Sequence, residues 1–389
     1  MVRALFVTAS LRPYGGAEHH SLALMNRLLE RGHTCQAVFV KGTGRSLDGI
    51  HLHDRATVRC LDAARYLDLR AVADLAAHIA AFKPSIILAA NPYPLMYATL
   101  AQMRSRASPR LVVTYHSTRL PNLKERLQTV VYRPFFWHAD CAVFVCEQQR
   151  RYWLRRAVFS RRNEVIHNGV DVDAFRDRST VEERATLRRE LGWSEADYVI
   201  GASAWLRPEK NHVQLLDAVA RLRQMGIPAR ALMIGDGEMR GFLEARAHRL
   251  GLGNHVVITG AQRDVRRYVA ICDVMVLCSV AVETFSLAAL EAMALARPVV
   301  HSDLGGASEM IFPGRNGFLF PVGDTEAFVD RLATLSDRAI ARRMGEQARL
   351  VVEKLFSEDA MIDRYESLLL GPSSGVLSKR GDAREIERA

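Results

Sequence analysis

The sequence predicts an α/β protein built from two Rossmann-like domains, each a parallel sheet with helices on both faces. Short, continuous apolar runs alternate with helical segments along the chain, a pattern typical of parallel strands that are buried on both faces. The pattern restarts after a polar, charged segment at 171–193. The 389 residues suffice for two domains of ordinary size.

The first half is predicted to start with a strand at Leu5–Thr8, followed by a turn at Gly15-Gly16 and an amphipathic helix from about Ala17 to Arg31. Further strands are expected at Ala37–Val40, Ser85–Ala89, Leu111–Tyr115, Ala142–Val145 and Glu164–His167. We therefore assign residues 1–172 to an N-terminal domain and place the boundary near Val172–Asp177.

The second half, residues 173–352, repeats the alternation. Its predicted strands are Tyr198–Ala204, Ala229–Ile234, His255–Thr259, Val274–Leu277 and Pro298–His301. A helix is expected at Asn211–Met225, further helices from Asp324 to about Ala348, and a last amphipathic helix at roughly Ser357–Leu370. The polar tail 371–389 is predicted to be disordered.

Composition narrows the class of protein. The formal net charge of +10 favours polyanionic partners in general, whether nucleic acid, an anionic membrane or phosphorylated substrates. The six cysteines are scattered without a CxxC pair, which argues against a zinc site or a disulfide framework and favours a reducing cytoplasm. No apolar run is long enough to span a bilayer, and the N-terminal run is too short for a signal peptide.

Two cations follow the first strand of the second half. Arg207 and Lys210 lie in Leu206–Asn211, between a predicted strand and a predicted helix. In parallel sheets, ligands bind at the carboxyl ends of strands, and a helix N-terminus favours anions. The pair suits a diphosphate, although two solvated surface charges would give the same pattern.

Two acidic residues, Glu283 and Glu291, follow the strand Val274–Leu277 with seven residues between them. If a helix starts near Glu283, eight positions amount to just over two turns, so both carboxylates would point to similar faces. One could then meet a sugar and the other ribose hydroxyls. The spacing alone is common on surface helices, but the apolar neighbours of Glu291 are unusual for a solvated face.

Several other loops are candidates. Gly305-Gly306 could bring backbone N–H groups to an anion or a sugar, or could form a tight turn. Thr259–Gln262 could contact a base edge. The turns at Gly15-Gly16 and Gly235–Gly237 do not have the GxGxxG spacing, which disfavours a dinucleotide site. His116, at the end of Leu111–Tyr115, is either structural or a group that faces the same crevice.

Residues 119–162 are basic and aromatic. They contain ten Lys and Arg residues against three acids, interleaved with Phe135, Phe136, Trp137, Tyr152 and Trp153. This composition suits an anionic membrane surface or a lipid-diphosphate acceptor. A solvated helix with some rings in the core would give the same composition. Nucleic acid fits the charge as well, but no nucleic-acid motif is present, so no nucleic-acid partner is predicted.

Taken together, these residues resemble the retaining glycosyltransferases of family 4, the glycosyl transferases group 1, which have the GT-B fold. The resemblance extends from Met1 to about Leu370. It rests on an ordered set of motifs: Gly15–Glu18, His116, Ile166–Asp171, Arg207 with Lys210, Gly235–Gly237, Glu283 with Glu291, Gly305-Gly306 and Gly314–Leu319. Each is weak alone, and the order and spacing carry the resemblance.

The resemblance implies roles for individual residues. Arg207 and Lys210 would hold the donor diphosphate, and Glu291 the ribose. The donor sugar would be held by Glu283 and the backbone after it. His116 would lie near the transferred sugar, and Gly16 would let the N-terminal loop approach the phosphates. In this way the resemblance gives four catalytic residues, His116, Arg207, Lys210 and Glu283, and seven donor-binding residues, Gly16, Gly235, Thr284, Phe285, Ser286, Leu287 and Glu291. It also implies that the helix within 353–370 returns to the first domain.

The predicted chemistry is metal-independent, needs no cofactor and has no covalent nucleophile, because fixed cations can stabilise the leaving diphosphate. Asp171 and Asp173 have the spacing of an Asp-x-Asp metal site but fall at the predicted hinge. The resemblance implies a front-face reaction with retention of configuration. Closure of the two domains would exclude water.

The predicted function is transfer of a hexose from a UDP- or GDP-sugar to a glycan or lipid-linked acceptor, in cell-envelope polysaccharide or lipopolysaccharide assembly. The protein would be cytoplasmic, with peripheral contact at the inner face of the membrane. Two alternatives remain open here. A nucleotide-sugar epimerase of the same fold would need acid and base residues beside the sugar, and a non-catalytic nucleotide-sugar-binding subunit would share the binding residues.

Overall fold

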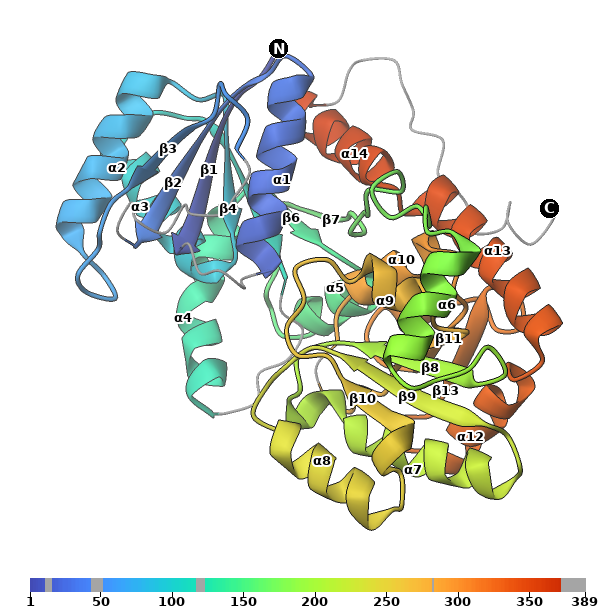
Figure 1. Ribbon diagram of the computed structural model, residues 1–389. Coiled ribbons are helices and arrows are strands. Elements are labelled where there is room, and N and C mark those ends of the chain that lie inside the picture. Colours follow the sequence, from blue (N-terminus) through green and yellow to red (C-terminus); the bar gives the residue numbers. More distant parts are fainter. Residues whose placement is uncertain (11–15, 43–51, 117–122, 282, 372–389) are drawn as a thin grey trace.

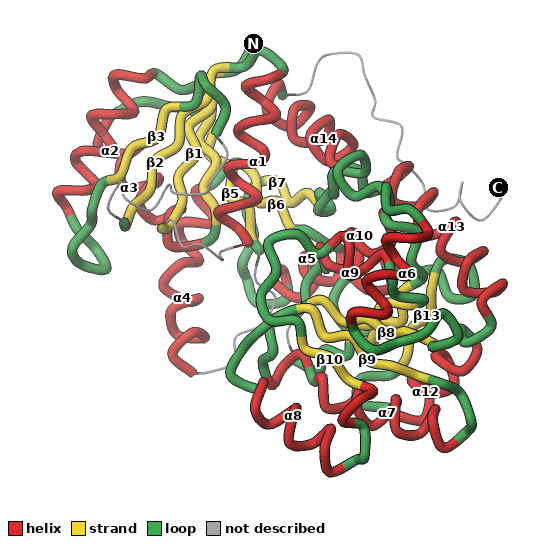
Figure 2. The backbone as a smooth tube through the Cα atoms, in the orientation of Figure 1, coloured by secondary structure: helices red, strands yellow, loops and turns green. Residues whose placement is uncertain are grey.

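The computed structural model describes residues 1–10, 16–42, 52–116, 123–281 and 283–371. Gly15, Arg119 and nearly all of the predicted tail therefore lie outside the described residues. In the described chain, two parallel sheets form the cores of two α/β halves that face each other (Figures 1 and 2). This arrangement confirms the predicted fold class.

The N-terminal half contains a seven-stranded parallel sheet of order β3-β2-β1-β4-β5-β6-β7. The chain moves outward from β1 to β3, then returns to the other side of β1 with β4, so the topological switch point lies between β1 and β4. The strands are β1 (Arg3–Ser10), β2 (Thr34–Lys41), β3 (Thr57–Cys60), β4 (Ile86–Ala90), β5 (Arg110–Tyr115), β6 (Cys141–Phe144) and β7 (Arg162–Val165).

Helices cover both faces of this sheet. The apolar side chains of β4 alternate between the two faces: Ile87 and Ala89 pack under α2 (Leu69–Phe82), α3 (Pro92–Ser105) and α4 (Leu123–His138). Ile86 and Leu88 pack in the opposite cluster, under α1 (Gly16–Glu30) and α14 (Glu358–Leu370). Burial on both faces explains why these strands read as continuous apolar runs.

The C-terminal half contains a six-stranded parallel sheet of order β10-β9-β8-β11-β12-β13, with its switch point between β8 and β11. Its strands are β8 (Tyr198–Ser203), β9 (Ala229–Ile234), β10 (Val256–Ile258), β11 (Val274–Leu277), β12 (Val299–Ser302) and β13 (Gly317–Phe320). The surrounding helices are α6 (Val181–Glu190), α7 (His212–Gln224), α8 (Arg240–Arg249), α9 (Arg266–Ala270), α10 (Leu287–Ala294), α12 (Thr325–Thr334) and α13 (Arg338–Leu355).

The chain passes between the halves twice, and the two passages lie side by side. The backbone N–H of Val170 donates to Phe356, and the N–H of Glu358 donates back to Val170. The passages touch so closely that a Cβ on Gly169 would lie 2.6 Å from the carbonyl oxygen of Ser357. α14 then packs on α1, where ion pairs join Arg31 to Asp363 and Glu366 (Figure 1).

Most predicted strands coincide with observed ones, and the differences concern helices and edges. The helical region expected to end near Ala348 continues in α13 to Leu355, so the predicted domain limit at 352 falls inside a helix. β7 ends at Val165, before His167. The expected helix start near Glu283 is wrong. α10 starts at Leu287 because the Ser286 hydroxyl caps it by accepting the N–H of Ala289.

Candidate functional site

A cavity of about 870 Å³ lies between the two halves. It opens at the carboxyl ends of the strands that flank both switch points, where the loops of a doubly wound sheet bind ligands. In the N-terminal half, α1 and the residue after β4 contribute His20 and Asn91 to its wall. In the C-terminal half, the segment after β8 contributes Trp205, Arg207, Glu209 and Lys210, and the segment after β11 contributes Cys278, Ser279 and Glu283–Ala288.

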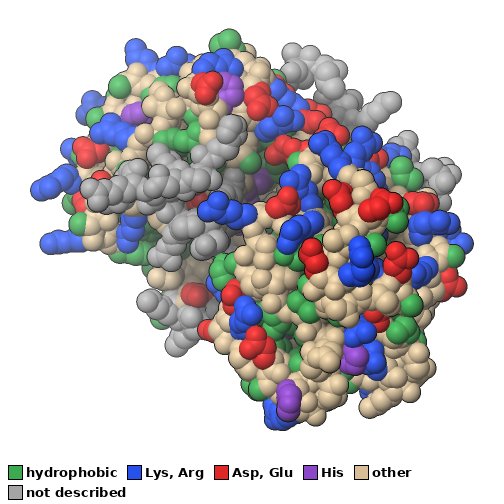
Figure 3. Space-filling view, in the orientation of Figure 1, with side chains coloured by type: hydrophobic (Ala, Val, Ile, Leu, Met, Phe, Trp, Pro, Cys, Tyr) green, Lys and Arg blue, Asp and Glu red, His purple; other side chains and the backbone are tan. Residues whose placement is uncertain are grey.

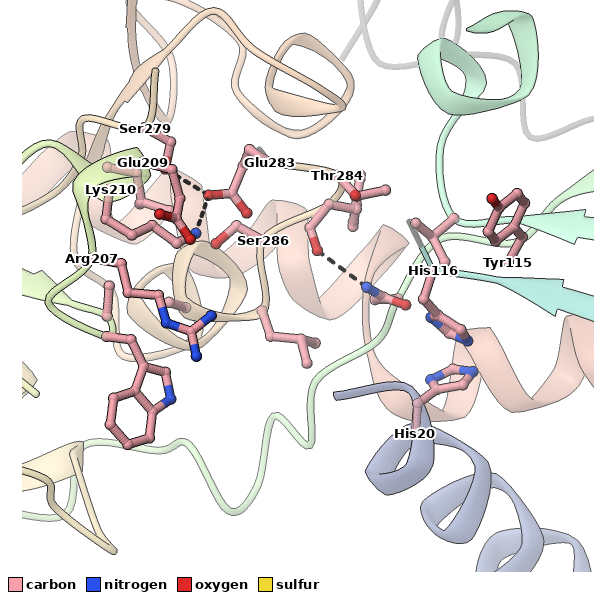
Figure 4. Close-up of a pocket in the computed structure, with 18 of the residues that line it drawn as sticks. His20, Tyr115, His116, Arg207, Glu209, Lys210, Ser279, Glu283, Thr284 and Ser286 are labelled. Atoms are coloured by element: carbon pink, nitrogen blue, oxygen red, sulfur yellow. Dashed lines mark hydrogen bonds and ion pairs between the residues drawn. The ribbon is translucent and has the colours of Figure 1, made fainter. Parts of the chain in front are cut away.

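The centre of the C-terminal wall is an ion pair. Lys210 lies in the 3-10 turn η2 (Pro208–Lys210), and its Nζ is 2.7 Å from Oε2 of Glu283. The Ser279 hydroxyl donates to the same oxygen over 2.9 Å (Figure 4). Oε1 of Glu283 has no hydrogen bond to the described residues and remains able to accept one from a ligand.

Electrostatics keep the Glu283 carboxylate charged. Burial by itself would raise the pKa of this carboxyl, whose side chain is only 10% exposed. The charge of Lys210, the nearby His301 ring and the two hydrogen bonds outweigh burial and hold the pKa below its usual value. His301 is fully buried at the end of β12, with its Nδ1 2.6 Å from the carbonyl oxygen of Ser302.

Arg207 behaves differently from Lys210. It precedes the same 3-10 turn and lines the same cavity, but it makes no ion pair with the described residues. Its guanidinium carbon lies 5.9 Å from the centre of the Trp205 ring, which is also part of the wall. Figure 4 shows Arg207 below Lys210 and Glu283, on the same side of the pocket. The wall therefore presents one cation held by a carboxylate and one held beside an aromatic ring.

The segment from Thr284 to Leu287 lines the cavity and leads into α10. The N-terminal end of this helix is therefore directed at the same space as Arg207 and Lys210, which adds partial positive charge. The segment is held from behind by the glycine pair. A Cβ on Gly305, whose φ is +63°, would lie 2.2 Å from the carbonyl oxygen of Glu283. The N–H of Gly306 donates to Thr284.

The sequence left open whether the glycine pair contacts a ligand or forms a tight turn, and the structure shows it in contact with the protein's own backbone. Gly305-Gly306 packs on the protein's own backbone and supports the Glu283 segment. Gly235 has a similar role, because its Cβ would lie 2.0 Å from the carbonyl oxygen of Ala204, just before Trp205. Gly235 is not among the described residues that line the cavity. Gly16 is the first residue of α1, and its place as a donor-binding residue stays a prediction. The described geometry gives Gly235 a supporting position.

Glu291 lies apart from the other acidic residue. It is in the middle of α10, whereas Glu283 precedes the helix, so the expectation that both share a helix face is wrong. Glu291 is also not among the lining residues of the cavity. Burial raises the pKa of its carboxyl to about 7. Three of the four side chains expected to gather around one ligand, Arg207, Lys210 and Glu283, do share the cavity.

The N-terminal wall carries neutral rings. His116 directly follows β5, and its backbone N–H donates to the side chain of Asn91 over 3.1 Å. Burial, and then the neighbouring His20 ring, lower the pKa of His116 well below its usual value. Its Nε2 is buried and has no hydrogen-bond partner among the described residues. Figure 4 shows the His116 and His20 rings together, across the pocket from Arg207.

His20 was not predicted from the sequence. Its ring centre lies 4.8 Å from that of His116, and its Nε2 is 3.3 Å from the Tyr365 hydroxyl on α14. Burial lowers the pKa of His20 to about 4. Because its partner is 345 positions away in sequence, only the folded chain reveals this contact. Trp205, Ser279 and His301 were also missed, although each lies at or just after the end of a predicted strand.

The aspartate pair at the crossing has a local role. One oxygen of Asp171 accepts the backbone N–H groups of Asp173 and Ala174, so this side chain caps a turn. Among the described residues, no three His, Cys, Asp or Glu side chains are grouped as metal ligands would be. The cysteine thiols are free. Within the described chain, no helix is both long and apolar enough to cross a bilayer.

Two parallel-sheet domains that face each other across such a cavity define the GT-B fold. The model of the glycosyl transferases group 1 matches residues 183–351, and the model of glycosyltransferase family 4 matches residues 14–174. The two matches together cover most of the chain. The chain therefore belongs to the group 1, family 4 glycosyltransferases.

Individual proteins agree with this placement. EpsD of Bacillus subtilis is 30% identical over 60% of this chain, and the match spans 62% of EpsD, which is less than two thirds of its length. The lipopolysaccharide core biosynthesis glycosyltransferase LpsE of Rhizobium meliloti is 27% identical over 91% of this chain and 96% of its own. The crystal structure of Anabaena HepE in complex with UDP superposes with a TM-score of 0.83, at 22% identity, over 95% and 99% of the two chains.

Proposed function

We propose that this protein transfers a hexose from a UDP- or GDP-sugar to a glycan or lipid-linked acceptor, with retention of configuration and without a metal ion. The observation that carries the proposal is the C-terminal wall, where Arg207, Lys210 and the N-terminal end of α10 face one cavity. Three sources of positive charge in one place suit the two phosphates of a nucleotide sugar. The UDP bound to HepE, a protein of the same fold, is in keeping with such a donor.

Each wall would have its own part in the reaction. As the bond between the sugar and the diphosphate breaks, negative charge grows on the leaving group, and Arg207 and Lys210 would stabilise it. Glu283 would hold Lys210 through Oε2. Its Oε1 would accept a hydrogen bond from a hydroxyl group of the sugar. His116 would offer its unpaired Nε2 to the sugar from the opposite wall. Glu291, one turn into α10, would bind the ribose after a local adjustment.

The proposed acceptor and cellular role rest on the names of proteins that are similar to this chain. LpsE and the O-antigen chain mannosyltransferase C of Escherichia coli carry names from lipopolysaccharide assembly, and both resemble this chain at 27% identity. We place the protein in cell-envelope polysaccharide or lipopolysaccharide assembly, working from the cytoplasmic face of the membrane.

The test starts with a panel of UDP- and GDP-hexoses in a thermal unfolding assay. A true donor at about a hundred times its Kd raises the free energy of unfolding by about 2.7 kcal/mol. The selected donor is then incubated with candidate acceptors, and the anomeric configuration of the product is read by NMR. Release of the nucleotide together with a retained linkage supports the proposal.

Arg207→Ala is the matched variant for this assay. Because Arg207 has no ion pair with the described residues, the variant should unfold at the same temperature as the wild type and lose about 100-fold in kcat/KM. A new epimer formed from the donor without release of the nucleotide would instead indicate an epimerase. Donor binding without turnover against any acceptor, and full cellular function of Glu283→Ala, would indicate a binding subunit.

A further inference from the structure

Helix α4 has one side in the cavity. Five of its residues line the cavity wall, namely Glu125, Gln128, Thr129, Tyr132 and Phe136. Their spacing places them along a single face of the helix. In Figure 1, α4 lies at the border of the N-terminal half, on the side turned toward the C-terminal half. The helix is therefore part of the wall on which an acceptor would rest.

The opposite side of α4 is apolar and exposed. Leu127, Val130, Val131 and Trp137 are 61%, 50%, 61% and 47% exposed. At 3.6 residues per turn, the mean direction of these four lies roughly 180° from that of the cavity-lining residues. We call them the outer face of α4. An apolar stripe opposite a functional stripe has no explanation in the packing of this domain, because burial would normally remove it from water.

The outer face continues onto the next segment of chain. The Trp137 ring lies 6.1 Å from that of Phe159, which is itself 42% exposed. The indole N–H of Trp137 donates to the carbonyl oxygen of Ala157 and thereby fixes α4 to this segment. Leu154, five residues before Phe159 in the same segment, is also exposed, at 36%.

Arginines accompany this apolar area. At 100° per residue, Arg126 and Arg133 lie along one edge of α4, between the outer face and the cavity face. Arg155 and Arg156 are exposed between Leu154 and Phe159. Glu125, the one acidic residue in the sequence of α4, points to the cavity instead. On the face drawn in Figure 3, Lys and Arg side chains are mixed with Asp and Glu side chains over both halves.

We propose that the outer face of α4 docks on an anionic lipid surface. Exposed Leu, Val and Trp side chains with arginines at the edge have the composition of a helix that lies in a membrane interface, where the rings and aliphatic groups enter the lipid and the cations meet anionic headgroups. Of the five aromatic residues noted in 119–162, Trp137 lies on this surface, whereas Phe136 and Trp153 are buried in the core.

The position of α4 between lipid and cavity would also help to bind the acceptor, an inference that rests on the proposed function. A helix that touches lipid on one side and lines the cavity on the other brings the cavity within a helix diameter of the membrane, about 10 Å. An acceptor whose lipid tail stays in the bilayer could then present its polar headgroup along Gln128, Thr129 and Tyr132. The substrate class inferred for this wall is a membrane-embedded lipid-linked acceptor.

Vesicle flotation with the full chain tests the docking. The vesicles are phosphatidylcholine alone, or phosphatidylcholine with phosphatidylglycerol. We expect the wild type to float mainly with the phosphatidylglycerol vesicles. The double variant Leu127→Glu/Val131→Glu should bind roughly tenfold less, because two carboxylates replace apolar groups that enter the lipid. Leu350→Glu on α13 is the control, since Leu350 is also an exposed leucine on a helix, at 56%, and should float like the wild type.

Other readouts separate this proposal from the proposed function. Both variants should keep the wild-type unfolding temperature, the same thermal shift with the donor nucleotide and the same donor hydrolysis in the absence of vesicles. If the nucleotide shift is missing in every variant but flotation depends on the outer face, the donor proposal fails and the docking stands. Flotation that is equal for the double variant and the wild type overturns the docking. So does a wild-type dimer that the double variant converts to monomers, because a second copy would then cover this face.

Discussion

The two walls of the cavity differ in charge: the C-terminal wall carries charged side chains, and the N-terminal wall carries neutral histidine rings. The C-terminal wall concentrates charge, with Arg207 and the Lys210–Glu283 pair beside the start of α10. The N-terminal wall places neutral rings opposite, because burial lowers the pKa values of His20 and His116. Charge that is fixed before a reaction starts stabilises a leaving diphosphate at little reorganisation cost. Neutral groups would suit the role proposed for this wall, which is to accept and release an uncharged sugar.

The largest effect should come from Lys210→Ala. The change removes a cation from the proposed diphosphate site and leaves the nearly buried Glu283 without its cationic partner. We expect kcat/KM to fall by about 10²–10³-fold, and the free energy of unfolding to fall by about 2–4 kcal/mol, since a buried charge loses its partner. Donor turnover and chemical denaturation measure the two losses.

Arg221→Ala is the control for this variant. Arg221 is paired with Glu326 between α7 and α12, on the surface of the same half. Exposed pairs contribute little to stability, so this variant should leave both turnover and unfolding near wild type. If the two variants behaved alike, the Lys210–Glu283 pair would be an ordinary surface contact and the contrast between the walls would disappear.

The neutral histidines of the N-terminal wall should make the free energy of unfolding fall at acidic pH. The pKa of His20 is about 4 in the folded protein, against about 6.5 in the unfolded chain. The unfolded state therefore binds the proton first, and the stability that neutral His20 provides is complete above pH 6.5 and is lost as the pH falls toward 4. The difference between these two pKa values corresponds to about 3 kcal/mol.

His20→Gln tests this expectation and keeps a hydrogen-bonding group near Tyr365. Urea unfolding at a series of pH values from 7 to 4 should show a shallower loss of stability in the variant than in the wild type. Equal slopes would mean that His20 takes up its proton as readily in the folded protein as in the unfolded chain, and that burial does not keep this wall neutral.

Much of the fold could be read from the sequence because its physical basis is local. Runs such as Val274–Leu277 are apolar throughout, since both faces of the sheet are covered, and the prediction matches β11 residue for residue. β3 was missed because it is a short edge strand whose side chains are not fully buried. The start of α10 was misjudged although Ser286 before an apolar run is a typical N-cap signal.

The residues of the site likewise divide into those that the sequence could predict and those that it could not. Arg207, Lys210 and Glu283 lie in the segments that connect a strand to the next helix, so the rule for parallel sheets could find them. His20 could not be found, because its position depends on a contact between α1 and α14, at opposite ends of the chain. Glu291 shows a third case, since its sequence spacing was recognised but the loop before α10 placed Glu283 outside the helix.

Glu291 gives the C-terminal half a pH dependence of opposite sign. Burial raises the pKa of this carboxyl to about 7, against about 4.5 in the unfolded chain. The folded state therefore holds the proton longer. The stability contribution is complete below about pH 4.5 and is lost as the pH rises through about 7. The loss amounts to about 3 kcal/mol.

Glu291→Gln should remove this loss, so that the variant becomes more stable than the wild type above pH 7. Isothermal titration with the donor nucleotide adds the functional half of the test. If ionised Glu291 accepts the ribose hydroxyls, donor affinity should rise with pH between 6 and 8 in the wild type only. A wild-type affinity that does not change with pH would place the ribose elsewhere.

The smallest expected effect concerns the support of Arg207. Its guanidinium has no carboxylate partner among the described residues and lies beside the Trp205 ring, at a distance where a cation–π contact contributes about 0.5–1 kcal/mol at an exposed site. Trp205→Leu should therefore raise the KM for the donor about two- to fivefold while kcat changes little, because the cation remains but is less well held. Trp205→Tyr keeps an aromatic face and should recover most of the affinity.

The comparison sharpens the contrast within the C-terminal wall, since Lys210 is fixed by charge and Arg207 by an uncharged ring. A donor KM that is equally poor in the Leu and Tyr variants would show that Trp205 contacts the nucleotide itself through features that only an indole has.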